Sequence, residues 1–187
     1  MLSTRQISTI AVMTAACVAT NYLLVGVVNV KFMDPIIFVS GLTFGAVVGS
    51  SIGALTWLVY GTINPYGFSL PILVTTCLSE MIYGLAGGVL GYLGFSGNDN
   101  PKKAQKLMNG FEFAVIGFLL TAIYDFITNI AMALSLGLPI LSVLIAGIIF
   151  TLLHEVSNAV FFFLGVAPLV IIIKKIPYLT KKQVMKT

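Results

Sequence analysis

Charged residues are scarce in this 187-residue chain: Asp, Glu, Lys and Arg make up 9% of it, whereas 58% is hydrophobic. A soluble domain of this size needs more charge to cover its surface, so the composition and the mean hydropathy of +1.05 predict a polytopic membrane protein. The pI of about 9.1 does not indicate nucleic-acid binding, because the lysines flank apolar segments and form no patch interleaved with aromatic residues.

Histidine and cysteine are scarce too, which narrows the possible chemistry. The two cysteines, Cys17 and Cys77, lie within apolar runs and indicate packing residues, because a disulfide or metal site needs more ligands at closer spacing. The single histidine, His154, opens a stretch like the HExxH zinc motif, but Asn158 stands where the second histidine must be. With no phosphate-binding loop and no recognisable nucleophile motif, we expect no enzyme, no metal site and no cofactor in this chain.

What the chain does have is apolar runs, and these predict an all-α integral membrane protein with six transmembrane helices in one domain over residues 1–187. The expected helices cover about residues 7–28, 34–48, 50–62, 71–94, 111–135 and 140–173. As one helix, residues 34–62 would be about 43 Å long, too long for a bilayer core without strong tilt. We therefore expect a turn at Gly49-Ser50-Ser51 between two short helices.

The basic residues predict the orientation in the membrane. With six helices, nine of the ten lie on one side and only Lys31 on the other, which favours cytoplasmic termini. The nine are Arg5, Lys102, Lys103, Lys106, Lys174, Lys175, Lys181, Lys182 and Lys186. A five-helix arrangement gives the same ratio, so segment length and the Gly-Ser-Ser turn decide the number of helices.

Three of the predicted helices each carry polar side chains along one face. Helix 71–94 has Thr76, Glu80 and Tyr83; helix 111–135 has Thr121, Asp125 and Asn129; helix 140–173 has Thr151, His154, Glu155 and Asn158. An ionisable group in hydrocarbon costs at least about 2.5 kcal/mol, so such residues usually face a cavity or one another. Their similar depths predict one pocket open to the outside. The alternative is an internal hydrogen-bond network, for instance with His154 donating to Asp125.

Aromatic and amide residues near the outer ends, among them Trp57 and Asn64, are interface anchors or pocket walls. Small residues recur every four positions at Ala11, Ala15 and Ala19, a spacing that permits close helix approach inside the protein or against a partner. Glycines with the same spacing in residues 41–53 and 84–91 favour packing within the monomer.

The opening from Arg5 to Ala19, the stretch from Val30 to Gly53 with Asp34-Pro35, and the six-helix layout with one charged cytoplasmic loop resemble the S component of an energy-coupling factor (ECF) transporter. The resemblance implies a subunit in the cell membrane that captures a vitamin or vitamin precursor from outside. It also implies that the captured ligand is delivered into the cell through a transmembrane coupling (T) component and two cytosolic ATPases, which use ATP.

Carried over by position, Ala11, Ala15 and Ala19 are the expected docking face for the T component, and residues 63–70 a lid. The expected substrate-binding residues are Glu80, Tyr83, Asp125, Asn129, His154, Glu155, Asn158, Trp57 and Asn64. The excess of acidic groups favours a cationic or donor-rich nitrogen heterocycle, such as thiamine or a queuosine-type precursor. The alternatives are a small proton- or ion-coupled carrier, or an integral membrane enzyme that uses Asp125, His154 and Glu155 as acid–base groups.

Overall fold

The computed structural model describes residues 2–64, 67–95 and 103–175, with the backbone alone for 103–109 and 174. The described residues form helices and no strand, which confirms the predicted fold class. The six helices are α1 (Thr4–Leu23), α2 (Met33–Phe44), α3 (Ala46–Thr62), α4 (Leu70–Tyr92), α5 (Lys103–Leu136) and α6 (Ile140–Lys174). Lys102, Lys181, Lys182 and Lys186, which contributed to the predicted orientation, lie outside the described residues.

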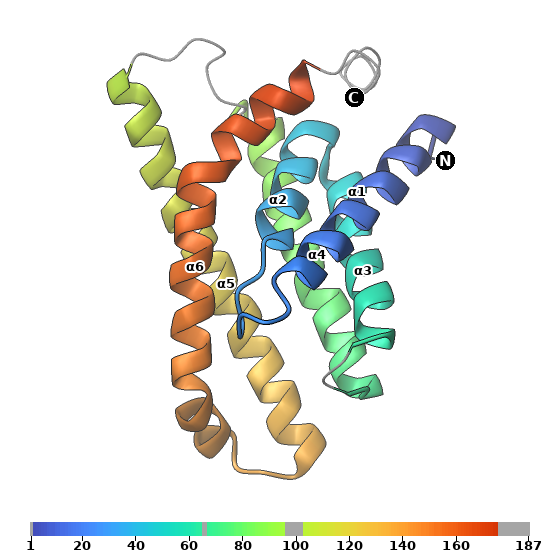
Figure 1. Cartoon of the computed structure of the whole chain (residues 1–187), viewed down its shortest axis with the longest axis vertical. Helices are drawn as coiled ribbons and strands as arrows, with labels where there is room; N and C mark the ends of the chain where they lie inside the picture. The colour runs from blue at the N-terminus through green and yellow to red at the C-terminus, as the bar shows by residue number, and fades with distance from the viewer. Residues whose placement is uncertain (1, 65–66, 96–102, 176–187) are drawn as a thin grey trace.

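The helices run up and down in one bundle, and α1 begins at the end of the molecule where α6 ends (Figure 1). Four of them, α1, α4, α5 from residue 110, and α6, are long and apolar enough to cross a membrane. At 1.5 Å per residue, α2 is only about 18 Å long and α3 about 26 Å. Because α2 is short, the α1–α2 loop turns back near the middle of the long axis (Figure 1).

Three predicted helix limits are wrong. The first helix ends at Leu23, not near residue 28, because the apolar residues that follow form the α1–α2 loop, and hydropathy does not separate an apolar loop from a helix. The turn between α2 and α3 falls at Gly45, whose φ of +93° favours glycine, and not at Gly49–Ser51. Helix α5 already begins at Lys103, within the segment expected to be a loop.

Helices α2, α3 and α4 pack through glycine, as the spacing predicted. A methyl group added to Gly41, Gly49 or Gly84 would lie less than 3.0 Å from the backbone of a neighbouring helix. The three backbones are therefore in direct contact, which confirms the prediction of packing within the monomer. Gly49 serves this contact, which explains why the turn lies elsewhere.

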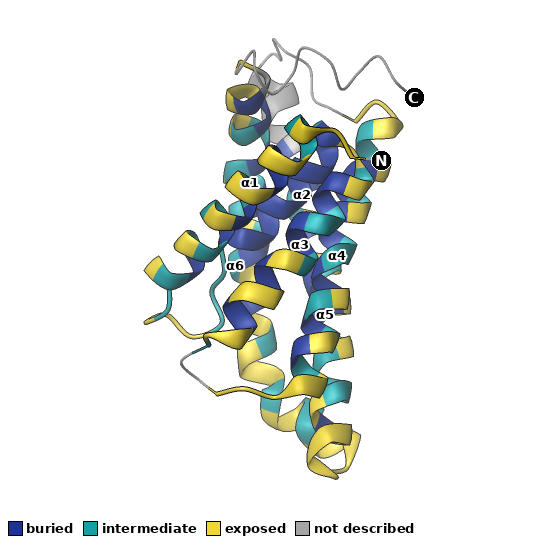
Figure 2. Cartoon of the chain, turned by 90° about the vertical axis from the view of Figure 1, so that its right-hand side faces the viewer, coloured by how far each residue is buried: buried dark blue, intermediate teal, exposed yellow. Residues whose placement is uncertain are grey.

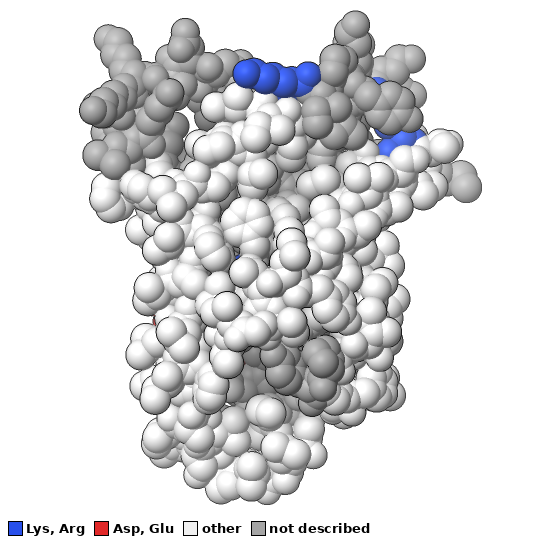
Figure 3. All heavy atoms as spheres, viewed as in Figure 1, with Lys and Arg blue, Asp and Glu red and all other residues white. Residues whose placement is uncertain are grey.

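The buried residues lie along the inner faces of the helices, and the outer faces are exposed (Figure 2). Many exposed side chains are large and apolar, such as Val12, Leu78 and Ile149. On the face shown in Figure 3, Lys and Arg side chains gather at the end where α1 begins, and the flank is almost free of charge. This distribution fits a multi-pass membrane protein with its apolar flank in lipid.

Candidate ligand-binding site

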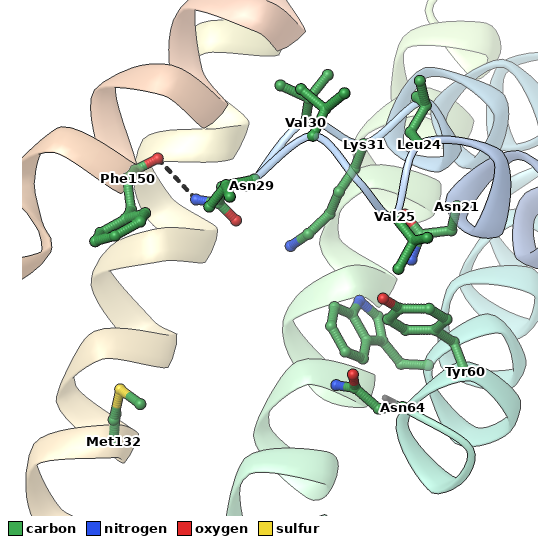
Figure 4. Close-up of a pocket in the computed structure, with 13 residues that line it drawn as sticks. Asn21, Leu24, Val25, Asn29, Val30, Lys31, Tyr60, Asn64, Met132 and Phe150 are labelled. Carbon is green, nitrogen blue, oxygen red and sulfur yellow. Dashed lines mark hydrogen bonds between the residues drawn. The ribbon is translucent and has the colours of Figure 1, made fainter. Parts of the chain in front are cut away.

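A cavity of about 480 Å³ lies between the α1–α2 loop, the last turns of α3 and the α5–α6 pair (Figure 4). Its walls combine apolar side chains with aromatic and amide residues. The aromatic residues are Trp57, Tyr60 and Phe150, and the amides are Asn21, Asn29 and Asn64. The helix segments that line it are the end of α1, the end of α3, the second half of α5 and the first half of α6. The cavity therefore lies toward the end of the bundle opposite the start of α1.

A second cavity of about 680 Å³ continues between α5 and α6. It shares residues from the loop, α3, α5 and α6 with the first, so the two are neighbouring parts of one hollow. The shared residues are Asn29, Lys31, Trp57, Met132 and Phe150. Asp125, Asn129 and Tyr124 line only the second part.

The α1–α2 loop is fastened at two points. The Asn29 side-chain amide donates a hydrogen bond of 2.7 Å to the Phe150 carbonyl on α6, which closes one side of the cavity (Figure 4). The Tyr22 hydroxyl donates to the Ile63 carbonyl at 2.9 Å, which fixes the end of α1 against the segment after α3. The predicted lid, residues 63–70, contributes Asn64 to the cavity, but residues 65 and 66 lie outside the described residues.

Lys31 extends from this loop into the hollow (Figure 4). Its ammonium nitrogen lies 5.1 Å from the centroid of the Trp57 ring and 4.9 Å from that of Tyr124, within the range of cation–π attraction. The two rings are nearly parallel, with centroids 6.4 Å apart and planes 26° apart. A cation therefore lies beside an aromatic wall inside the cavity.

Beneath the hollow, His154 bridges two carboxylates. Its Nδ1 lies 2.9 Å from Asp125 Oδ1 and its Nε2 lies 2.9 Å from Asp34 Oδ2. Both ring nitrogens can donate to ionised carboxylates only when the imidazole carries its second proton; otherwise one carboxyl group must be protonated. This bridge joins α2, α5 and α6. In either case its three groups together carry one proton more than a neutral imidazole and two ionised carboxylates would carry.

Further hydrogen bonds extend this layer to α3 and α4. The Asn158 amide donates to Asp34 Oδ2 at 2.5 Å and to the Thr121 hydroxyl at 2.8 Å. Tyr83 on α4 donates to the same threonine oxygen at 2.9 Å. On the other side, the Trp57 indole N–H donates to Glu80 Oε2 at 2.9 Å, so a cavity residue is bonded to a buried acid.

The sequence-predicted residues therefore separate into two groups. Trp57, Asn64, Asp125 and Asn129 line the hollow. Glu80, Tyr83, His154 and Asn158 are buried in the layer beneath it, and Glu155 is buried on α6 without lining either part. Asp125 belongs to both the wall and the layer, and Trp57 in the wall is bonded to Glu80 in the layer.

Sequence reasoning missed Asp34, Lys31 and Tyr124. Asp34 is 0% exposed at the centre of the layer, although its position before Pro35 made it look like a residue at a helix boundary. Lys31 was counted as a lone charge on the outer side. The spacing of Lys31 and Asp34, opposite charges three residues apart beside an apolar segment, was the available signal.

The expected docking residues Ala11, Ala15 and Ala19 are all exposed on α1. Thr14, Cys17 and Asn21 of the same helix are buried instead. The alanine face is thus directed away from the bundle, and its contact with a partner stays a prediction.

The fold and the hollow are those of a helical membrane protein with space for a small molecule between its helices. Residues 1–175 match the family described as ECF-type riboflavin transporter, S component, and the chain belongs to that family. Members are vitamin-binding subunits of transporters and not enzymes, and they work with a T component and ATPases. No curated protein and no solved structure shows significant similarity to the chain.

Proposed function

We propose that this protein captures a flat, neutral heteroaromatic vitamin of the riboflavin type in the hollow beneath its α1–α2 loop. The observation that carries the proposal is the cavity itself, which has aromatic and amide walls at the end of the bundle opposite the start of α1. Its two parts, about 480 Å³ and about 680 Å³, fall in the range of small-molecule sites.

The wall chemistry supports a flat ligand with both donors and acceptors. The rings of Trp57, Tyr60 and Tyr124 provide surfaces on which a heteroaromatic ring can stack. Side-chain amides offer both an N–H donor and a carbonyl acceptor, so they match imide edges and hydroxyl groups. The wall amides are Asn21, Asn29, Asn64 and Asn129.

The charge of the site also favours a neutral ligand. The sequence-based preference for a cationic heterocycle counted the acids of α4, α5 and α6 without a basic partner. Lys31 now stands in the cavity, and His154 is shared between Asp34 and Asp125. These two basic groups offset part of the acidic charge, so the excess of acids alone no longer argues for a cationic ligand.

Riboflavin titration of the purified protein, together with mass spectrometry of any co-purifying ligand, tests this function. We expect tight binding, and a large loss of affinity for Trp57→Ala because its stacking surface is removed. Tyr92→Ala is the matched control, since Tyr92 is 83% exposed at the end of α4. A protein that does not bind riboflavin, or a strictly cationic co-purified ligand, would contradict the proposal.

We further propose that both termini are cytoplasmic, so that the hollow faces outside, and that the ligand is delivered by a T component driven by two ATPases. The exposed alanines of α1 support a docking role, because a smooth face permits close helix approach. Ala15→Leu should weaken copurification with the T component and leave riboflavin affinity unchanged. Val115→Leu, at a 57% exposed position on α5, is the control. Equal loss of both properties would contradict a docking role for Ala15.

A further inference from the structure

We propose that Lys31 is a ligand-binding residue whose ammonium group hydrogen-bonds the carbonyl or ring-nitrogen edge of the heteroaromatic ligand while the ligand's ring stacks at the Trp57–Tyr124 wall. This inference rests on the proposed function and goes beyond it, since it names the residue that selects the ligand and the ligand atoms that it recognises.

The first support is where the Lys31 side chain ends. Lysines near a membrane usually extend toward water, whereas this one points into a cavity enclosed by the loop, α3 and the α5–α6 pair (Figure 4). It lines both parts of the hollow. A molecule in either part would therefore come within reach of the same ammonium group.

The second support is what the ammonium group contacts. The ammonium group lies over the faces of Trp57 and Tyr124. Within the described ranges, the ion pairs of Asp34 and Asp125 are with His154 and not with Lys31. Ring faces attract a cation but accept no strong hydrogen bond, so the three N–H donors of Lys31 are available to a ligand. Acceptor atoms on the ligand would satisfy donors that are costly to leave unpaired in an apolar cavity.

The third support is the near-parallel arrangement of the rings. Lys31 lies about 5 Å from both centroids, beside the surface on which a flat molecule would stack. Its flexible four-carbon stem allows the ammonium to move from the ring faces to the edge of a bound ligand. The same charge repels a cationic ring, which makes the site selective for acceptor-rich neutral molecules.

A structural role for Lys31 is the competing explanation, because its charge also acts on the buried acids Asp34 and Glu80. The two roles differ in their effects. A counter-charge that only stabilises the fold affects the thermal stability of the ligand-free protein. A ligand-binding group changes the dissociation constant of the ligand. The size of that change depends on whether the ligand carries the acceptor atoms that Lys31 contacts.

The test measures dissociation constants of riboflavin and of lumiflavin, which keeps the isoalloxazine ring with its carbonyl and ring-nitrogen acceptors but has a methyl group in place of the ribityl chain. Lys31→Met should weaken both by the same factor, roughly tenfold to hundredfold, as expected for the loss of a hydrogen bond to a charged group. Lys175→Met, which removes one positive charge at the exposed end of α6, should change neither. Thiamine should not compete with riboflavin at the wild-type site.

Unchanged affinity in Lys31→Met would overturn the inference, as would a loss for riboflavin alone or effective competition by thiamine. Lys31→Arg keeps the cation and should bind riboflavin more tightly than Lys31→Met, so equal affinities of these two variants would contradict it even if both are less stable. A wild-type protein that binds neither riboflavin nor lumiflavin would instead refute the proposed function, and the role of Lys31 with it.

Discussion

The sealed layer and the open hollow above it use polar residues in opposite ways. In the sealed layer, defined as Asp34, Glu80, Tyr83, Thr121, Asp125, His154 and Asn158, the side chains bond mainly to one another. In the hollow, Lys31 and Asn129 are only partly buried and face space that a ligand can fill. An ionisable residue inside an apolar helix therefore does not by itself mark a ligand contact; mutual hydrogen bonding separates the two roles.

Two residues connect these regions. Asp125 lines the hollow and bonds to His154, whereas Trp57 lines the hollow and donates to Glu80. Binding in the hollow is therefore next to a layer that joins α2, α4, α5 and α6. Substitutions in the layer, at a connecting residue and in the hollow separate the contributions of the two regions.

The largest effect is expected in the sealed layer. Asp34→Ala leaves His154 Nε2 without its acceptor and removes one of the two acceptors of the Asn158 amide. Breaking a buried ion pair by removing one partner typically costs about 3–5 kcal/mol, so the unfolding temperature should fall strongly. Thermal unfolding in detergent measures this effect.

Glu112→Ala is the matched control for Asp34→Ala, because it removes an exposed acid of α5 that belongs to neither region. The control should leave the unfolding temperature nearly unchanged. If both variants were equally stable, the bonds of Asp34 would contribute nothing, and the distinction between a sealed layer and an open hollow would lose its energetic basis.

An intermediate effect is expected at the connection. Trp57→Phe keeps an aromatic ring in the wall but leaves Glu80 Oε2 without its indole donor, which should reduce the unfolding free energy by about 1–3 kcal/mol. Riboflavin affinity should fall less than in Trp57→Ala, because a ring that can stack remains. Chemical unfolding and riboflavin titration of both variants provide the two measurements. Equal losses of affinity would show that the indole N–H, and not the ring surface, supports binding.

Composition and spacing predicted much of the fold. Apolar runs predicted the six helices, and glycines at four-residue spacing predicted the contact of α2, α3 and α4, because both properties are local in sequence. The His154–Asp125 bond was among the predicted alternatives, since the two residues lie in polar stripes of adjacent helices. These predictions succeeded where periodicity alone determines which face of a helix is buried.

Periodicity could not predict the positions of Asp34, at the centre of the layer, and of Lys31, the cation in the hollow. Lys31 lies in the loop just before α2 and Asp34 in its first turn, where hydropathy indicates the edge of the membrane. The α1–α2 loop instead turns back near the middle of the long axis (Figure 1). Depth there depends on where the chain turns back, and the apolar loop sequence does not show that turn.

The smallest effect is expected for the hydrogen bond that holds the α1–α2 loop over the hollow. Asn29→Gly removes the hydrogen bond to the Phe150 carbonyl, and glycine accepts the φ of +54° at this position without strain. Loss of one hydrogen bond, about 0.5–1.5 kcal/mol, should accelerate riboflavin dissociation roughly twofold to tenfold in stopped-flow measurements. The unfolding temperature should change little, because the sealed layer is intact.

Val27→Gly distinguishes the lost bond from added backbone freedom, since it places a glycine in the same loop at a 53% exposed position. Because Val27 also lines the cavity, Val27→Ala is measured beside it to correct for the lost side chain. A dissociation rate raised equally by Val27→Gly would assign the effect to loop flexibility. A rate raised only by Asn29→Gly would show that the contact between the loop and α6 retains the ligand. The hollow would then open on the α6 side by loss of one neutral hydrogen bond, whereas the layer beneath it is held by a histidine bonded to two acids. Opening the hollow would therefore not require disrupting the layer.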